Sequence, residues 1–428
     1  ARGEPRVVAL GGGALINPDA RRLAEETGQI LCLSASLENL ISRLDPASGD
    51  RPLLAGNLAE RLSHLLAERA DHYRSFEHQL VVDGLEISEL VWKAQQQLGA
   101  FRVSGMGPAY DVRIQRGGLG QLGSYFSTLG LKDPVAVVTD NNVAGRCLEN
   151  VMTSLKSAGY HPYAYSIEPG EEHKTIETVL SVWDFFIKAG IERRSTVVAL
   201  GGGVVGDLTG FAAAAFLRGV AWVNLPTTLL AMVDSSLGGK TGVDLPQAKN
   251  LVGSFYPPRL VLADPEVLGT LPARELRGGL AEVIKHGIID DPELFNRCAE
   301  GWTFITGNID WVVRRGMAVK LKVISTDPYE KGLRQALNLG HTIGHGIEIA
   351  SNFQLTHGES VAIGMAAEAH LAEVLNLAEP GLVQCVVDAL KQVGLPTTIP
   401  MGLDLARVVE AMQFDKKRAA GKVQFALP

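Results

Sequence analysis

The sequence lacks an uninterrupted apolar run long enough to cross a membrane. Its most apolar region, residues 196–233, is broken by Asp207, Arg218 and several glycines, whereas a membrane span needs roughly 20 consecutive apolar residues. Cysteine is also sparse: the chain has four, and they are not closely paired in sequence. This spacing is typical of reduced thiols rather than of a disulfide framework. We therefore predict a soluble cytoplasmic protein.

Basic residues are not in excess either. The 40 lysines and arginines are outnumbered by 47 aspartates and glutamates, which gives a formal net charge of -7. A general nucleic-acid-binding protein would need a basic face, so neither nucleic acid nor a membrane is an expected partner. Small anionic substrates remain compatible, because local clusters of lysine and arginine decide their binding. Hydrophobic residues make up 46% of the chain, enough to bury a sizeable core.

One heptapeptide, Val-Val-Ala-Leu-Gly-Gly-Gly, occurs twice, at residues 7–13 and 197–203. Each copy is typical of a buried strand that runs into a glycine turn. Because the flanking sequences differ, we interpret the copies as two separate α/β units rather than as a duplication.

The expected fold class is α/β. In the middle of the chain, strands at 110–115, 135–139, 163–167 and 196–200 alternate with helical stretches, which is the rhythm of a parallel sheet. We expect a ligand site in the cleft between this α/β domain and the helical domain that follows it. The predicted parts are a first α/β unit at 1–100, a linker at 101–109, a nucleotide-binding α/β domain at 110–271 and a mostly helical domain at 272–428.

A glycine-rich turn follows the strand at 196–200. Residues 201–206 satisfy the G-x-G-x-x-G pattern, whose glycines let a pyrophosphate approach the backbone at a helix N-terminus. The acidic partner usually found about 20 residues later is missing, but Asp140 ends an earlier strand and could hold a ribose hydroxyl. The alternative is a glycine turn used only for packing.

Histidines gather in the helical domain. His341 and His345 lie one helical turn apart, His357 follows, and Glu282 lies upstream. A glutamate with two or three histidines would suit a catalytic zinc ion with one position left for substrate. The spacing leaves open which histidines bind the metal.

From about residue 110 to the end, motifs follow one another in the order and spacing of 3-dehydroquinate synthases, which this part of the chain resembles. The matching segments are 169–174, 201–207, 226–228, 233–242, 249–250, 278–286, 338–345 and 357–359.

The resemblance implies roles for individual residues. Zinc, which cobalt could replace, would be held by Glu282, His341 and His357, and His345 would be a catalytic residue on the substrate side. The other residues expected at the substrate are Arg218, Lys240, Asn250, Lys285, Lys320, Arg334, Asn338 and Lys416. NAD would contact Asp140, Asn142, Glu171, Lys174, Gly201, Gly202, Gly203, Asp207, Thr227, Thr228, Asp234, Lys249, Thr270, Leu271 and Glu275.

The implied reaction belongs to the shikimate pathway of aromatic amino acid biosynthesis. It converts 3-deoxy-D-arabino-heptulosonate 7-phosphate to 3-dehydroquinate and phosphate through transient oxidation by NAD, phosphate elimination, reduction and aldol closure. The family also implies a homodimer. Two alternatives remain open, another NAD- and metal-dependent sugar-phosphate cyclase and a polyol dehydrogenase of similar fold.

Residues 6–92 resemble the C-terminal half of shikimate kinase, a P-loop kinase. By that resemblance, Gly11, Gly12, Gly13 and Arg69 would contact shikimate and Arg51 would reach over the nucleotide, although the match departs at residues 71–72. No G-x-x-x-x-G-K-[ST] phosphate loop occurs in the sequence. We therefore expect a piece of a kinase–synthase fusion without kinase activity of its own; a non-catalytic scaffold is the alternative for this unit.

Overall fold

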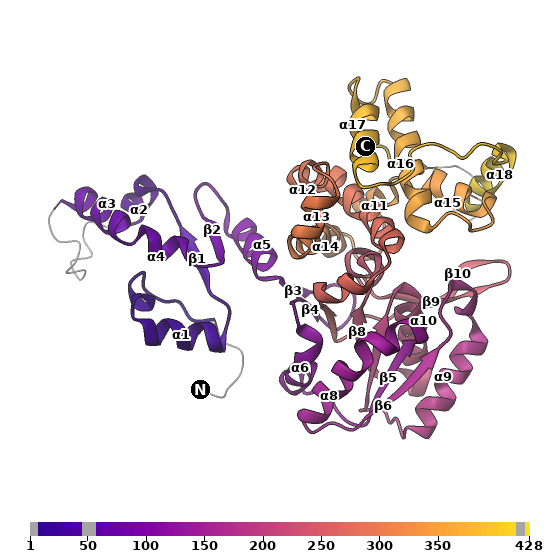
Figure 1. Ribbon diagram of the computed structural model, residues 1–428, viewed down its shortest axis with the longest axis horizontal. Coiled ribbons are helices and arrows are strands. Elements are labelled where there is room, and N and C mark those ends of the chain that lie inside the picture. The colour runs from indigo at the N-terminus through magenta and orange to yellow at the C-terminus, as the bar shows by residue number, and fades with distance from the viewer. Residues whose placement is uncertain (1–6, 45–56, 417–423) are drawn as a thin grey trace. The chain divides into compact units, whose positions relative to one another are not determined.

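A computed structural model describes residues 7–44, 57–416 and 424–428. The chain divides into two compact units, Ala1–Phe101 and Arg102–Pro428. Strands and helices alternate over most of the length (Figure 1), so the predicted α/β class is confirmed. None of the helices within the described ranges combines the length and apolar character that crossing a bilayer requires.

The first unit contains a two-stranded parallel sheet, β1 (Leu31–Ser34) with β2 (His78–Val81). Its helices are α1 (Pro18–Thr27), α2 (Leu37–Arg43), α3 (Leu58–Glu68), α4 (Ala70–Arg74) and α5 (Ile87–Leu98), with a short 3-10 turn η1 (Ala14–Ile16).

The strand expected before the first glycine turn is not formed. Residues 7–10 have no strand structure, and Val7, Val8 and Leu10 are exposed. A strand needs a paired neighbour to satisfy its backbone, and among the described residues the sheet of this unit consists of β1 and β2 only. The prediction of a buried strand at this position is therefore wrong for the structure described.

The second unit is built on a seven-stranded sheet in the order β3-β4-β11-β8-β7-β5-β6. The strands from β4 to β6 are all parallel. Part of the segment expected to be a linker is the edge strand β3. The bounds are β3 (Ala100–Val103), β4 (Tyr110–Ile114), β5 (Val135–Asp140), β6 (Pro162–Ile167), β7 (Thr196–Gly201), β8 (Ala221–Pro226) and β11 (Leu260–Ala263).

Helices cover both faces of this sheet (Figure 1). Alternate residues of β5 face opposite sides: Val135 and Val137 pack with α6 (Leu122–Leu129) and α8 (Glu149–Ser157). Ala136 and Val138 pack with α9 (Ile176–Lys188) and α10 (Gly203–Ala215). Burial on both faces explains why the central strands are continuous apolar runs.

The order of the strands reverses between β5 and β7. The chain passes from β5 outward to β6 and then returns to β7 on the other side of β5. In sheets of this kind a crevice opens beyond the carboxyl ends of the strands at the reversal. Asp140 and Gly201 end β5 and β7 at this point.

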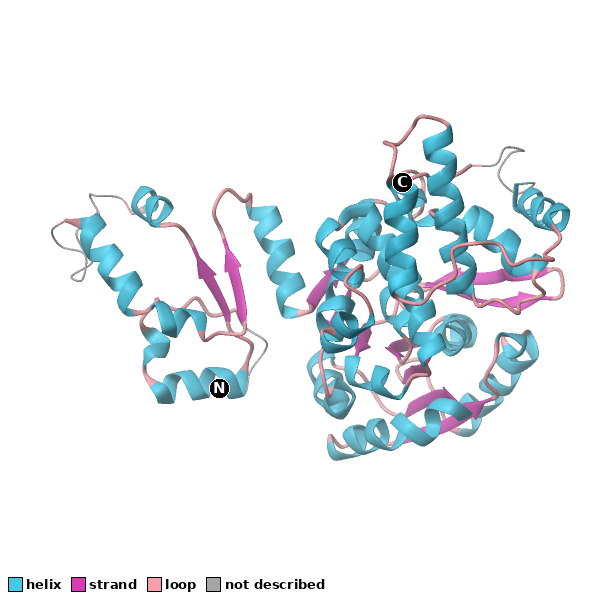
Figure 2. Cartoon of the chain, turned by 45° about the horizontal axis from the view of Figure 1, so that its top comes forward, coloured by secondary structure: helices cyan, strands magenta, loops and turns pink. Residues whose placement is uncertain are grey.

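The rest of the second unit is mainly helical (Figure 2). An antiparallel ribbon, β9 (Lys240–Leu245) with β10 (Ala248–Phe255), comes before β11. The helices are α11 (Ala273–Asp290), α12 (Pro292–Cys298), α13 (Trp302–Gly307), α14 (Ile309–Thr326), α15 (His341–Ala350), α16 (His357–Val374), α17 (Leu382–Gln392) and α18 (Leu405–Lys416), with a 3-10 turn η9 (Leu333–Asn338) before α15.

Glycines let α11, α15 and α16 approach one another closely. A Cβ atom added at Gly358 would lie 2.1 Å from the carbonyl oxygen of Gly278, and one at Gly364 would lie 2.0 Å from that of Gly340. Both neighbours are backbone atoms, which cannot move aside as a flexible side chain can. These contacts fix the distance between the helices that carry Glu282, His341 and His357.

We therefore expect Gly364→Ala to destabilise the protein, by about 1–3 kcal/mol or more because the backbone must separate. Without that contact the change would stabilise the helix by roughly 1 kcal/mol, so the sign of the effect is informative. The measurement is the free energy of unfolding in urea. Gly307→Ala is the matched control, because Gly307 is exposed at the end of α13 and its added Cβ would meet nothing within 4 Å. Equal free energies of unfolding for the Gly364 variant and the unmodified protein would contradict the packing argument.

Candidate functional site

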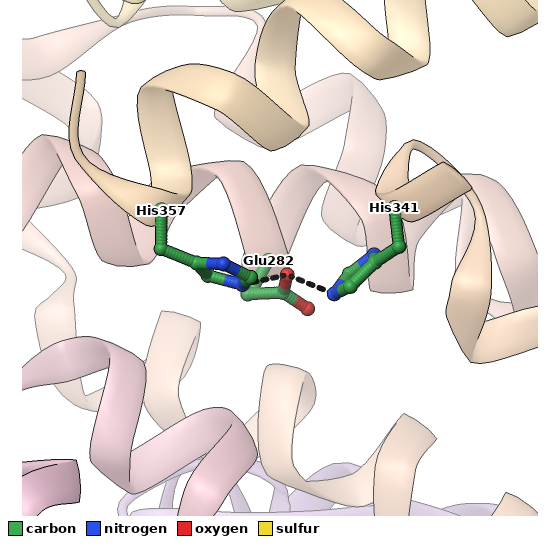
Figure 3. Close-up of side chains that lie close together, drawn as sticks. All are labelled: Glu282, His341 and His357. Atoms are coloured by element: carbon green, nitrogen blue, oxygen red, sulfur yellow. Dashed lines mark ion pairs between the residues drawn. The ribbon is translucent and has the colours of Figure 1, made fainter. Parts of the chain in front are cut away.

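Three side chains from three helices meet in the helical half of the second unit. Glu282 lies inside α11, and His341 and His357 are the first residues of α15 and α16. The Oε1 atom of Glu282 is 3.5 Å from Nε2 of His341 and 3.8 Å from Nε2 of His357. Figure 3 shows the carboxylate between the two imidazole rings.

Local sequence explains where the two histidines stand. Gly340 has a positive φ of 78°, a conformation that glycine adopts without strain, and it turns the chain into α15. Thr356 caps α16 and forms a capping box with Glu359. Both histidines are thereby held at helix starts.

The donor set fits a zinc ion. One ligand atom of each of Glu282, His341 and His357 lies within 4.8 Å of the others, and zinc binds carboxylate and imidazole groups. Glu282 is fully buried, and its Oε2 atom forms an ion pair with Lys285. Its Oε1 atom faces the two imidazole rings instead, which is the side on which a metal ion would bind.

Burial and charged neighbours set the protonation states of the three candidate ligands. Burial alone would raise the pKa of Glu282, but its ion-pair partner Lys285 and the two histidines hold that pKa well below its usual range. Burial and Lys285 keep the pKa of His341 well below its usual value. Burial would also lower the pKa of His357, but Glu282 and Glu348 raise it to about 9. Glu282 is therefore ionised and His341 neutral, as ligands must be, whereas His357 carries a proton that a bound metal ion would displace.

His345 stands beside this set. Its ring centroid is 5.2 Å from that of His341 and 5.8 Å from that of His357. It forms a different possible group, with Glu348 and His357. The metal-binding pair suggested by the spacing of His341 and His345 is thus not the only arrangement that the geometry allows.

The strand reversal forms the other half of the site. Asp140 accepts hydrogen bonds from the backbone N–H groups of Asn142 and Val143, 2.8 and 2.9 Å long. Gly202 and Gly203 lead into α10, and Cβ atoms there would meet Thr228 at 3.2 Å and Ser235 at 3.0 Å. This turn therefore brings bare backbone to the mouth of the crevice, as phosphate binding requires.

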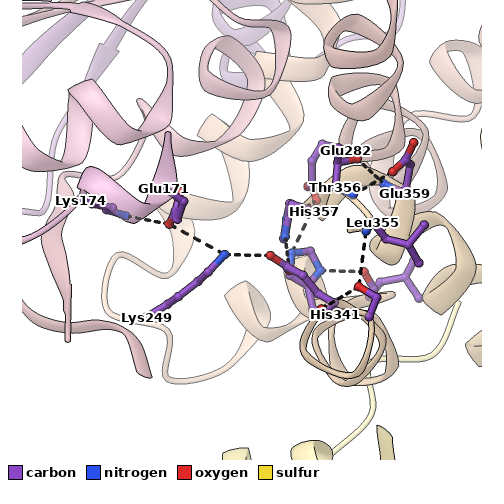
Figure 4. A network of polar contacts seen from close by, with 12 residues as sticks. Glu171, Lys174, Lys249, Glu282, His341, Leu355, Thr356, His357 and Glu359 are labelled. Atoms are coloured by element: carbon purple, nitrogen blue, oxygen red, sulfur yellow. Dashed lines mark hydrogen bonds and ion pairs between the residues drawn. The ribbon is translucent and has the colours of Figure 1, made fainter. Parts of the chain in front are cut away.

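A polar network lines the crevice beside the glycine turn. The buried Nζ of Lys174 donates to Oδ2 of Asp207 over 2.7 Å and to Oδ1 of Asn250 over 2.6 Å. Burial would lower the pKa of Lys174, but Asp207 and Glu171 raise it. Figure 4 shows the ion pairs that link Lys174 to Glu171 and Glu171 to Lys249. Lys174 is therefore a fixed cation.

Most of the cations expected at the substrate have carboxylate or carbonyl partners. Lys240 pairs with Glu330 at 2.5 Å, and Asn338 donates to the same carboxylate over 3.3 Å. Lys320 pairs with Asp234, and Arg334 donates to the carbonyl of Pro328. Burial lowers the pKa of Lys320. We call Lys240, Lys320 and Arg334 the cationic wall; an anionic ligand that binds there would displace Glu330 and Asp234 from two of these cations.

One cleft brings the predicted residues together. The residues that line it, out of those expected from the sequence, are Asp140, Asn142, Glu171, Lys174, Gly202, Gly203, Asp207, Thr227, Thr228, Asp234, Lys240, Lys249, Asn250, Thr270, Leu271, Glu275, Lys285, Lys320, Arg334, Asn338, His341, His345 and His357. Glu282 lies beneath this surface, against the two histidines.

Three expected residues are placed differently. Gly201 packs against Val205, whose side chain a Cβ atom would meet at 2.6 Å. Arg218 is exposed in the turn η6 (Phe216–Arg218), just before the amino end of β8. It therefore lies at the amino ends of the strands, whereas the crevice lies at their carboxyl ends. Lys416 is the last residue of α18, and its side chain lies outside the described part of the structure.

In the first unit, the glycine turn lies beside Arg69, one of the two arginines expected with it. The hydroxyl of Tyr73 donates to the carbonyl oxygen of Gly12 over 3.0 Å. The guanidinium of Arg69 is 3.2 Å from where a Cβ of Gly13 would stand. Arg51 lies outside the described residues.

Two acidic residues of the cleft were not predicted from the sequence. Glu330 contacts Lys240 and Asn338, and Glu348 contacts His357 and Lys249. Glu348 could have been suspected, because it lies seven residues after His341 and hence on the same helix face. Nothing in the local sequence pointed to Glu330.

Comparisons with known proteins agree over most of the chain. Residues 164–278 and 279–418 match family models described as 3-dehydroquinate synthase N-terminal and C-terminal, and residues 1–98 match the shikimate kinase model. A 3-dehydroquinate synthase from Rippkaea orientalis is 44% identical over 327 residues, which is 75% of this chain and 89% of that protein.

Two solved structures share both fold and sequence with the chain. A 2-deoxy-scyllo-inosose synthase complexed with carbaglucose-6-phosphate, NAD+ and Co2+ is 30% identical with a TM-score of 0.70; the match covers 76% of this chain and 89% of that one. A 2-epi-5-epi-valiolone synthase from Streptomyces hygroscopicus, with NAD+ and Zn2+ bound, is 30% identical with a TM-score of 0.69, over 77% and 92% of the two chains.

Proposed function

Since this chain belongs to the 3-dehydroquinate synthase family, we propose that its cleft converts 3-deoxy-D-arabino-heptulosonate 7-phosphate to 3-dehydroquinate and phosphate. The observation that carries the proposal is the meeting, in one cleft, of a glycine turn, a cationic wall and the Glu282, His341 and His357 set. A ring closure that needs hydride transfer, anion binding and a Lewis acid requires all three.

Zinc is assigned to Glu282, His341 and His357, and NAD to the crevice beyond β5 and β7. When bound, NAD supplies a reversible hydride acceptor and zinc acidifies a substrate hydroxyl. The residues proposed to hold NAD all line the crevice, and Gly201 supports the glycine turn by packing. They are Asp140, Asn142, Glu171, Lys174, Gly202, Gly203, Asp207, Thr227, Thr228, Asp234, Lys249, Thr270, Leu271 and Glu275. Lys174, already fixed by Asp207 and Asn250, holds its positive charge at this position.

The chain's own cations orient the substrate. Lys240, Lys320 and Arg334 are proposed to bind its phosphate and carboxylate, with Asn250, Lys285 and Asn338 in the same cleft. Lys416 is included only by resemblance. Holding both anionic ends at once brings the reacting carbons into a near-attack geometry. His345 faces the same space and is proposed to move a proton at the substrate. Arg218 enters the proposal only by resemblance, because it lies outside the cleft.

The test is incubation with the keto-sugar acid phosphate, NAD and zinc, with phosphate release and NADH absorbance both followed. We expect one phosphate per dehydroquinate formed and no net NADH, because the hydride returns to the product. Accumulation of NADH with a simple polyol would instead support a dehydrogenase. Failure of folded, zinc-loaded protein to release phosphate would overturn the proposal.

Further proposals concern the rest of the chain. We infer a cytoplasmic location, in keeping with the four free thiols Cys32, Cys147, Cys298 and Cys385. We also infer a homodimer, and light scattering tests that inference. For the first unit we propose that Gly11, Gly12, Gly13 and Arg69 form part of a shikimate-binding surface. The approach of Arg69 to Gly13 and the hydrogen bond from Tyr73 to Gly12 support this.

A further inference from the structure

Glu348 connects two parts of the cleft. We propose that Glu348 positions the metal ligand His357, and that Lys249 makes this positioning depend on the nucleotide crevice, so that NAD and zinc bind cooperatively. The inference rests on the proposed function in one respect: it takes Glu282, His341 and His357 as the zinc site and the crevice beyond β5 and β7 as the NAD site.

Glu348 contacts the ring of His357. The Oε2 atom of Glu348 is 3.4 Å from Nδ1 of His357, whose Nε2 faces Glu282. A ring that donates its Nδ1–H to a carboxylate keeps the lone pair of Nε2 free for a metal and is held in one orientation. Glu348 thus fixes which nitrogen of His357 is available.

His341, unlike His357, is oriented by a backbone group. Its Nδ1 is 3.1 Å from the backbone carbonyl of Leu339, two residues away in the chain. That partner is local and does not depend on the crevice. Of the two histidine ligands, His357 is therefore the one whose orientation can respond to a distant group.

Glu348 also contacts Lys249. The Nζ atom of Lys249, on β10, donates to Oε1 of Glu348 over 2.9 Å and lies 4.5 Å from the ring centroid of Phe353. It is also 4.0 Å from Oε1 of Glu171 in the crevice. Glu348 is buried, so its charge needs both partners. The contact joins the β9–β10 ribbon, which carries Lys249 (Figure 4), to α15, which carries Glu348.

The energetic consequence is a linkage between two ligands. NAD that holds the β9–β10 ribbon in place also holds Lys249 against Glu348, which keeps His357 oriented for zinc. By reciprocity, bound zinc favours the same arrangement and tightens NAD. Couplings of this kind are typically about 5–150-fold in affinity.

The experiment measures zinc affinity on the full chain by competition with a chromogenic chelator, without NAD and with saturating NAD. In the unmodified protein we expect NAD to tighten zinc binding about fivefold or more. Glu348→Gln should weaken zinc about 10–100-fold and abolish the coupling. Because Lys249 also lines the NAD crevice, NAD affinity is measured for each variant, and the coupling is compared at an NAD concentration that saturates it. At that concentration Lys249→Met should lose the coupling, while Lys249→Arg should keep it.

Two further measurements make the test specific. The visible spectrum of the cobalt-substituted protein should shift when NAD is added to the unmodified chain and not to the Lys249→Met variant. Glu300→Gln and Lys391→Met are matched controls, because each removes the same charge at an exposed position. Glu300 follows α12 and Lys391 lies on α17. Both variants should keep the coupling.

The outcomes separate the inference from the function on which it rests. If zinc and NAD both bind and phosphate is released, but NAD leaves zinc affinity unchanged, the coupling is overturned and the synthase stands. If the unmodified protein binds no zinc, both fall. Unaltered zinc affinity in a folded Glu348→Gln variant would overturn the positioning role by itself.

Discussion

Replacing Glu282 by glutamine is expected to remove zinc and to lower synthase turnover by about a thousandfold or more. Glutamine has nearly the same shape, so the packing of α11 is kept while the negative charge is lost. A Lewis-acid metal contributes several kcal/mol to catalysis, and about 1.4 kcal/mol corresponds to each factor of ten. The loss of charge also leaves Lys285, whose side chain is 1% exposed, without its ion-pair partner.

Zinc content after dialysis and the rate of phosphate release are the two measurements. Glu300→Gln is the control, since that glutamate is exposed and pairs with Arg297 away from the cleft. A Glu282→Gln protein that keeps one zinc per chain would disprove the assigned ligand set.

Replacing His345 by alanine is expected to separate zinc binding from catalysis. The variant should keep its zinc, because the Glu282, His341 and His357 set is complete without it. Its turnover should fall about 10²–10⁴-fold, the usual contribution of a residue that transfers a proton. His357→Ala, in contrast, should lose zinc as well as turnover.

The zinc content of the two variants decides between two arrangements. Loss of zinc from His345→Ala would favour the HxxxH pair of α15 as the ligands, or the group of His345 with Glu348 and His357. Retention of zinc with full turnover would show that His345 has no role in the reaction.

The central sheet could be predicted because its strands are buried on both sides. The expected strands at 135–139 and 196–200 correspond to β5 and β7, and the helical stretch expected between the strands at 163–167 and 196–200 corresponds to α9. Residues 7–10 have the same apolar sequence as 197–200 but form no strand. A strand depends on neighbours that its own sequence does not contain.

The site was predictable where chemistry depends on residue type and spacing. The glycine turn and the group of histidines were visible from the sequence alone. Residue spacing could not choose among the histidines, because Glu282 meets His341 and His357 through the packing of three helices; the choice came only from the family resemblance. The contact between Lys249 and Glu348 joins residues 99 positions apart, and no local pattern can signal such a pair.

The two histidines at the starts of α15 and α16 have an electrostatic consequence. Each helix carries a macrodipole whose positive end lies at its first turn, and the first residue of each helix reaches Glu282 with its side chain, within 3.8 Å. Each can stabilise a nearby negative charge by about 0.3–1 kcal/mol, more when partly buried. A substrate oxygen that becomes negative here would meet a field built from peptide groups, which no side-chain substitution removes.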